Sequence, residues 1–324
     1  MSASAPPVLI RIAKLASEGH TLTQKRRVEY RSLPTRRWIN RCDSRRVPFD
    51  WTVNPYRGCE YGCKYCYARY THEFMERWDS TAFEREIYAK DWDADAFRRE
   101  LRGVRRGQSI AIGTATDPYQ PAERKYELTR RVLEVLANTS GRRIYLTTKS
   151  DLPVRDIDLW SKVAERNEVS IAITITTTDQ VLARLLEPHA PRPDLRLRAM
   201  RQLSDAGLSV GVIAAPVLPL ITDSAESLEA VATEAKKAGA RRFGANVLFL
   251  KPSAQRVFFP FLEDQFPHLV ARYKANYDHD AFLRGSYPDR IGRLVREIRE
   301  RVGLFARDIS EPPPPMEDAQ LRLF

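Results

Sequence analysis

The sequence predicts an α/β fold built around a parallel sheet, and two observations lead to this class. Six short runs rich in β-branched residues alternate along the chain with amphipathic stretches, and strand–helix–strand repeats of this kind join parallel strands. In addition, no Gly-rich nucleotide-binding turn follows a run, so the six units either close partly into a barrel or lie open as a doubly wound sheet. Both arrangements bind ligands at the C-terminal ends of the strands, so motifs there matter most for function.

The strands are expected, in chain order, at residues 51–56, 109–113, 143–148, 169–175, 208–215 and 241–250. Helices are expected between them, where apolar residues recur at helical spacing and a glycine follows. These patterns are Val132, Val135 and Leu136 before Gly141, then Leu197, Met200 and Leu203 before Gly207, then Leu228, Val231 and Ala235 before Gly239. Residues 256–310 predict further helices after the last strand.

Length and composition indicate a globular protein, because 324 residues with 43% hydrophobic content bury a large core. We expect it in the cytoplasm and without a membrane partner. No early apolar stretch has the length of a signal peptide, and no run approaches the roughly 18 to 20 apolar residues of a membrane span. Thiols there are reduced, so the four cysteines favour metal binding or redox chemistry over disulfides.

Positive charge is concentrated at the N-terminus. The formal net charge is +11, and the first 50 residues hold 11 basic and 4 acidic side chains, which accounts for +7 of it. Residues 24–46 interleave arginines with Tyr30 and Trp38, a combination that suits phosphate contacts plus base stacking, or else a plain solvated face. We divide the chain into a basic extension (1–50), a core (51–255), a helical segment (256–310) and a Pro-rich linker with a tail (311–324).

Three of the cysteines lie within "NPYRGCEYGCKYCYAR", directly after the first expected strand. Their spacing is Cys-x3-Cys-x2-Cys, and Gly58 and Gly62 allow the backbone to curl so that the sulfurs converge. A zinc loop would need a fourth ligand, but His72 and Cys42 do not complete the usual two-pair spacing. An iron–sulfur cluster accepts thiolates this close together, and three ligands for four irons leave one iron open. The candidate ligands are Cys59, Cys63 and Cys66.

The sequence resembles the radical S-adenosylmethionine (radical SAM) enzymes, whose Cys-x3-Cys-x-aromatic-Cys loop holds a [4Fe–4S] cluster, with Tyr65 in the aromatic position. The phrases "GTATDPYQPAE", "LTTKS" and "LEPHAPRPDLRLRAMRQLSDAGLSVGV" are similar to the spore photoproduct lyase-related branch over residues 50–250. Within that branch it looks closest to a bacterial group of uncharacterised function. The resemblance implies a partial (β/α)6 barrel, here with the basic N-terminal extension and the C-terminal helices.

The resemblance also implies a reaction and a cofactor site. The open iron would chelate the methionine moiety of SAM, and the reduced cluster, served by an electron donor such as flavodoxin or ferredoxin, would yield a 5′-deoxyadenosyl radical that abstracts hydrogen from a substrate. Tyr65 should pack near the adenine. The expected contacts by moiety are Gly113, Thr114, Ala115, Thr116 and Asp117 for the methionine amino group, Thr148, Lys149 and Ser150 for its carboxylate, and Thr174 and Thr176 for the ribose.

Purely structural roles stay open as alternatives for several of these residues. Lys149 and Asp117 would form an ordinary surface ion pair, and threonines are common in strands. Cys42 would be a free or partly buried thiol, and His189 and Glu187 would make loop contacts. Spore photoproduct lyases use a cysteine after the cluster as a hydrogen donor, whereas no cysteine follows Cys66 here. That difference argues against thymine-dimer reversal by the lyase's own mechanism.

The chain ends in "AQLRLF" after the prolines of residues 312–315. This tail resembles the peptides that dock bacterial repair and replication proteins on the DNA polymerase sliding clamp, through Gln320, Leu321, Leu323 and Phe324; otherwise it folds back on its own domain. Together with the basic N-terminus it favours a DNA substrate. The competing functions are radical SAM chemistry on RNA, protein or a small molecule, and a non-enzymatic nucleic-acid-binding protein with a structural metal loop.

Overall fold

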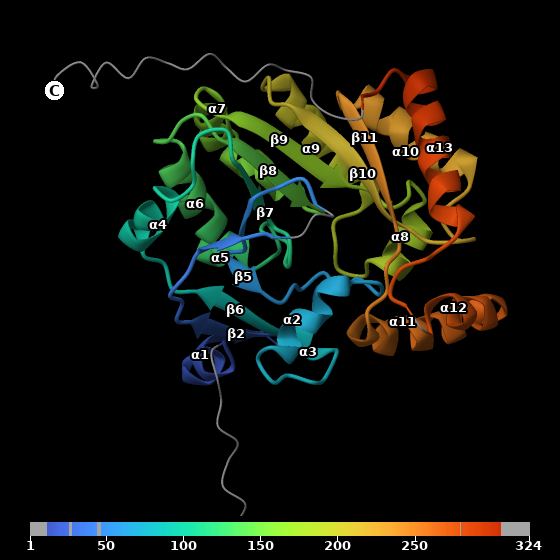
Figure 1. Ribbon diagram of the computed structural model, residues 1–324, viewed down its shortest axis with the longest axis horizontal. Helices are drawn as coiled ribbons and strands as arrows, with labels where there is room; N and C mark the ends of the chain where they lie inside the picture. Colours follow the sequence, from blue (N-terminus) through green and yellow to red (C-terminus); the bar gives the residue numbers. More distant parts are fainter. Residues whose placement is uncertain (1–11, 26–27, 44–46, 279, 306–324) are drawn as a thin grey trace, which may run out of the picture.

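The strands of the computed structural model, which describes residues 12–25, 28–43, 47–278 and 280–305, form two sheets (Figure 1). The larger sheet has seven strands in the order β11 (Arg242–Val247), β10 (Val210–Val217), β9 (Glu168–Thr174), β8 (Arg143–Thr148), β7 (Ser109–Ile112), β4 (Trp51–Val53) and β3 (Ile39–Arg41). Strands β4 to β11 of this sheet run parallel in chain order, and β3 pairs antiparallel with β4. Because β11 and β3 remain at opposite edges, the sheet is a partial barrel, as predicted.

All six predicted strand regions contain a strand of this sheet, although the first one divides. Residues 51–56 hold β4 and then the beginning of β5 (Tyr56–Arg57), which belongs to the smaller sheet. Pro55 lies between the two and has no backbone N–H for a strand ladder. The most interior strands are buried on both faces, as β9 shows with Ile173 at 0% exposure on one face and Thr174 at 3% on the other.

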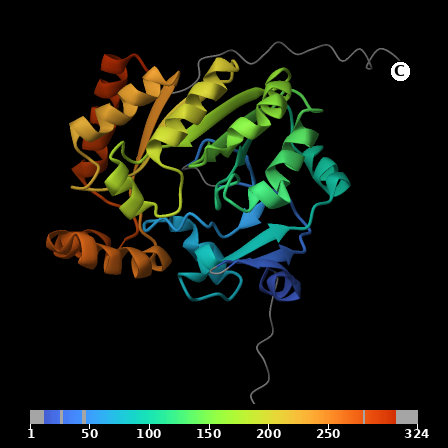
Figure 2. The same cartoon turned by 180° about the vertical axis from the view of Figure 1, so that it is seen from behind.

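The predicted helices are confirmed as α6 (Leu128–Leu136), α9 (Pro193–Asp205) and α10 (Ala225–Lys237), which lie with α7 (Ile157–Ala164) around the outside of the sheet (Figure 1). The C-terminal helices are α11 (Pro252–Gln265), α12 (Val270–Tyr277) and α13 (Ser286–Val302), and α13 packs on α10 and β11 (Figure 2). The remaining helices are α1 (Ile12–Glu18), η1 (Tyr67–Arg69), α2 (Tyr70–Glu73), α3 (Ala82–Arg85), α4 (Ala94–Leu101), α5 (Glu123–Tyr126), η2 (Leu152–Asp156), α8 (Gln180–Leu186) and η3 (Pro267–Leu269).

The smaller sheet was not predicted, and it uses part of the basic N-terminal segment. Its strands follow the order β1 (Thr21–Lys25), β2 (Val28–Leu33), β6 (Glu86–Lys90) and β5. The alternation of apolar and charged residues in "VEYRSL" reflects the two faces of β2. Tyr30 and Trp38 are each only 1% exposed; Tyr30 donates a hydrogen bond to Glu60, and Trp38 packs edge-on to Trp92. The prediction that these two rings stack on bases is therefore wrong.

Some predictions fall outside what the structure describes. The predicted docking tail lies beyond residue 305 and comprises Gln320, Leu321, Leu323 and Phe324, so docking on a sliding clamp stays a prediction. The domain boundaries at residues 50, 255 and 310 also stay predictions. Within the described residues, no helix has the length and apolar character needed to cross a membrane.

Candidate cofactor site

The cysteine loop begins directly after β5, where glycine is required. Gly58 has φ of +81°, and a Cβ there would lie 2.7 Å from the carbonyl oxygen of Glu86. A larger residue would therefore be strained both in its backbone and by contact with β6. Cys59 and Cys63 are buried and Cys66 is half-buried. The loop thus carries its three thiols on the inner side of the protein.

Residues after β7 hold the loop in place. The Thr116 hydroxyl donates to the carbonyl of Gly58, and Gln120 Nε2 donates to the same oxygen at 2.9 Å. Gln120 Oε1 accepts from the backbone N–H of Glu60 at 3.0 Å, and its side chain is fully buried. Thr116 was predicted to lie near the cofactor, and through this hydrogen bond it stabilises the cysteine loop. Gln120 was missed by the sequence reasoning, because nothing local marks a glutamine in a turn as a long-range clamp.

Replacing Gln120 with Leu is expected to lower the free energy of unfolding by about 1–3 kcal/mol, because the Glu60 N–H loses its buried partner. The loop should also retain less iron. Urea unfolding and iron per chain after anaerobic purification would measure both effects. The matched control is Gln202→Leu on the exposed face of α9. Wild-type values for both measurements in Gln120→Leu would contradict the clamp.

The thiols fit a cluster better than a single metal ion. Burial raises the pKa of Cys59 well above its ordinary value and that of Cys63 to about 12, so both are poor free nucleophiles and need a metal to become thiolates. No three His, Cys, Asp or Glu side chains of the described residues are arranged to hold one metal ion. A [4Fe–4S] cluster binds each cysteine to a different iron, so its ligands do not have to meet at one point.

The two candidates for a fourth ligand make other contacts. Cys42 follows β3 and donates its backbone N–H to Asp50, just before β4, whereas the cysteine loop follows the other end of β4. It is partly exposed and unbridged, as predicted. His72 is 1% exposed, and its Nε2 lies 3.0 Å from the carbonyl of Glu86. Cys59, Cys63 and Cys66 therefore stay the predicted cluster ligands.

A buried carboxylate connects the cysteine loop with the strand ends. The Tyr65 hydroxyl donates to Glu187 and lies 3.1 Å from the Thr176 hydroxyl, which donates to the same Glu187 oxygen at 2.8 Å. Lys149 Nζ is 4.0 Å from that oxygen and 5.6 Å from the centroid of the Tyr65 ring. Three predicted cofactor residues, which follow three different strands, thus meet at Glu187. From the sequence, Glu187 was expected only to make a contact within a loop.

Arg196, on α9, neutralises Glu187. The two side chains are each 1% exposed and form an ion pair, while Arg196 also donates to the carbonyl of Thr174 at 3.0 Å. Burial alone would raise the pKa of Glu187, but Arg196 and Lys149 outweigh it and hold the pKa below its ordinary value. The pairing of Arg196 with Glu187 could not be predicted from the sequence.

The turn after β7 is bound from both sides. Asn54 Oδ1 accepts the backbone N–H groups of Thr114 at 2.9 Å and Ala115 at 2.8 Å. Asp117 accepts from the Thr148 hydroxyl and from the backbone N–H of Lys149, both at 2.7 Å. The Lys149–Asp117 contact is thus made by the backbone, because the ammonium group turns to Glu187.

Ser150 and Thr174, two further residues predicted to contact the cofactor, are buried in the protein. The Ser150 hydroxyl accepts the N–H of Leu152, and Thr174 is 3% exposed. The structure brings the predicted residues to one end of the barrel, and their contacts with SAM stay predictions.

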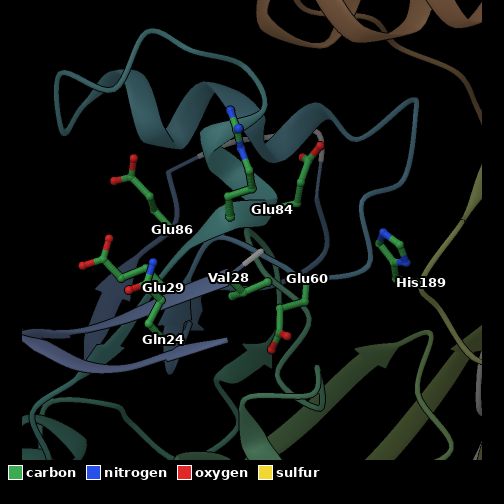
Figure 3. A pocket seen from close by; sticks show the side chains of 8 residues that line it. Gln24, Val28, Glu29, Glu60, Glu84, Glu86 and His189 are labelled. Carbon is green, nitrogen blue, oxygen red and sulfur yellow. The ribbon is translucent and has the colours of Figure 1, made fainter. Parts of the chain in front are cut away.

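A cavity of about 740 Å³ lies between the cysteine loop and the smaller sheet (Figure 3). None of the predicted cofactor residues lines it. Three of the four glutamates in its described lining are ion-paired with arginines. The lining residues are Gln24, Val28, Glu29, Glu60, Glu84, Arg85, Glu86 and His189. His189 is bound through its backbone N–H, which donates to Tyr61, in line with the predicted loop contact.

Comparison with known sequences identifies relatives. A family model described as the radical SAM superfamily matches residues 53–247. An uncharacterised protein of Mycobacterium tuberculosis (strain ATCC 25618 / H37Rv) is 36% identical over 274 residues, which cover 84% of this chain and 80% of that protein. An uncharacterised protein of Methanocaldococcus jannaschii is 27% identical over 249 residues, covering 76% and 86%.

Comparison with solved structures identifies the same fold. A spore photoproduct lyase mutant with bound AdoMet and dinucleoside spore photoproduct superimposes with a TM-score of 0.65 at 15% identity, covering 86% of this chain and 82% of that one. A spore photoproduct lyase complexed with dinucleoside spore photoproduct gives 0.62 at 14% identity, covering 84% and 79%. Identities this low establish the likeness of fold alone.

Proposed function

This chain belongs to the radical SAM superfamily, and from that premise we infer that it is a cytoplasmic enzyme acting on nucleic acid, with DNA as the favoured substrate, in repair or modification. Its cofactors are a [4Fe–4S] cluster and S-adenosylmethionine. The observation that carries the chemistry is the loop of three buried or half-buried thiols at the mouth of a partial barrel. The net charge of +11 and the fold shared with a lyase crystallised with a dinucleoside support the substrate class.

Each part of the site has a definable task. Cys59, Cys63 and Cys66 would hold three irons, and when bound the reduced cluster and SAM supply a radical that abstracts hydrogen from substrate. The chain itself contributes position and exclusion of water: Gln120 secures the loop, and the network around Glu187 fixes Tyr65 and Lys149 beside it. With no cysteine after Cys66, we propose no thiol donor in the later chain.

Anaerobic purification followed by electron paramagnetic resonance, with and without SAM, tests the chemistry. We expect about four irons and four sulfides per chain and a reduced-cluster signal that shifts when SAM binds the open iron. We also expect release of 5′-deoxyadenosine to rise with DNA, and DNA affinity to fall steeply with salt. A zinc-loaded, spectroscopically silent protein would overturn the radical assignment. Cofactor cleavage stimulated by RNA, protein or small molecules but not DNA would overturn the substrate.

A further inference from the structure

The short helical segment after the cluster loop has an unusual exposed face. Segment η1 and α2 runs from residue 67 to 73 without a break. One side is buried, with Ala68, Thr71 and His72 at 4% exposure or less. The opposite side of a surface helix is ordinarily polar.

Here that side carries aromatic rings. Tyr67, Tyr70 and Phe74 follow at intervals of three and four residues, which places them along one helical face, and Trp78 lies in the loop that follows α2. Tyr67 is 36%, Phe74 57% and Trp78 67% exposed. We call these four residues the aromatic row. Large apolar side chains grouped on a surface indicate a binding site.

The row begins next to a predicted cluster ligand. Tyr67 directly follows Cys66, its hydroxyl donates to the carbonyl of Thr114, and its ring centroid lies 4.8 Å from that of Phe249. Tyr70 and Phe74 meet edge to face at 5.5 Å. The row therefore begins at a predicted cofactor residue, and further along the chain the rings of Phe74 and Trp78 are open to solvent.

A cation accompanies the rings. Lys251 Nζ lies 3.4 Å from the centroid of Tyr70, at the beginning of α11, which packs against η1 and α2. An ammonium group beside exposed rings offers one contact for a phosphate and several for bases, which is how single-stranded nucleic acids are bound. Duplex DNA fits poorly, because its bases are already stacked and their faces are covered.

We propose that the aromatic row and Lys251 bind unpaired bases and backbone of single-stranded DNA and guide the strand to the cluster. This inference rests on the proposed function and adds the form of the substrate and its path. It also replaces Tyr30 and Trp38, which are buried, with rings that a base can reach.

Fluorescence anisotropy with labelled single-stranded DNA of mixed sequence tests the proposal. Trp78→Ala and Phe74→Ala should each weaken binding about tenfold, the range of one base–aromatic stack. Trp78→Phe should restore most of the affinity, whereas Trp78→Leu, apolar without a ring, should not. Lys251→Ala should reduce the salt slope by about one phosphate contact. The matched control is Phe305→Ala, which removes a ring that is 54% exposed. Phe305 pairs with Arg242 at the beginning of β11, whereas Lys251 follows the end of that strand.

Several results would overturn it. Wild-type affinity in Trp78→Ala and Phe74→Ala, or equally tight binding of the duplex, would remove the row from DNA binding. Losses seen only with RNA would make RNA the ligand, and a dimer lost in Trp78→Ala with unchanged DNA affinity would make the row an interface between copies. Iron content and SAM cleavage, measured on the same preparations, separate this failure from failure of the proposed function.

Discussion

Replacing Cys59, Cys63 or Cys66 singly with Ala is expected to abolish both the iron–sulfur cluster and the cleavage of SAM. Each cysteine would be the ligand of one iron, and Cys42 is the only other cysteine in the sequence, so no spare thiol lies in the loop to substitute. The measurements are iron and sulfide per chain after anaerobic reconstitution and 5′-deoxyadenosine formed under reducing conditions. We expect cleavage to fall to the background of a protein without cluster.

Cys42→Ala is the matched control, because it removes the remaining cysteine of the chain from the far end of β4. It should retain cluster and activity. Loss of the cluster in this variant would contradict the three-ligand assignment and, with it, the open iron. Circular dichroism of all four variants would show that the loss of iron does not reflect unfolding.

Replacing Glu187 with Ala is expected to destabilise the protein by about 3–5 kcal/mol, because Arg196 is left as a buried charge without its partner. Both side chains are 1% exposed, so water cannot replace the carboxylate. Tyr65 and Thr176 lose an acceptor at the same time. Urea unfolding of the wild type and the variant, under identical redox conditions, measures the difference.

The exposed pair of Arg192 and Asp194 provides the comparison. Its side chains are 50% and 36% exposed, and Asp194→Ala should change the unfolding free energy by no more than about 1 kcal/mol. Glu187→Gln, which keeps the shape and one acceptor oxygen, should fall between the two. Equal small effects from Glu187→Ala and Asp194→Ala would show that the network around Glu187 adds little to stability.

Local patterns were sufficient for much of the fold, and they are the basis on which the metal ligands are predicted. The helices ending before Gly141, Gly207 and Gly239 and the six parallel strands follow from periodicity within short windows, and the cysteine ligands are three residues within eight positions. The smaller sheet escaped because β2 pairs with β6, more than fifty residues later, and a basic alternating segment looks the same solvated or paired.

By itself, the sequence determined the class of fold, the cysteine loop and the residues at the strand ends, because spacing and composition act over a few residues. Only the tertiary structure decided which of these side chains meet. Tyr65 and Glu187 are 122 positions apart, and Glu60 and Gln120 are 60 apart. It also decided that Tyr30 is buried and Trp78 exposed. Burial and long-range hydrogen bonds depend on how helices and strands pack, and the local sequence around one residue does not encode its distant neighbours.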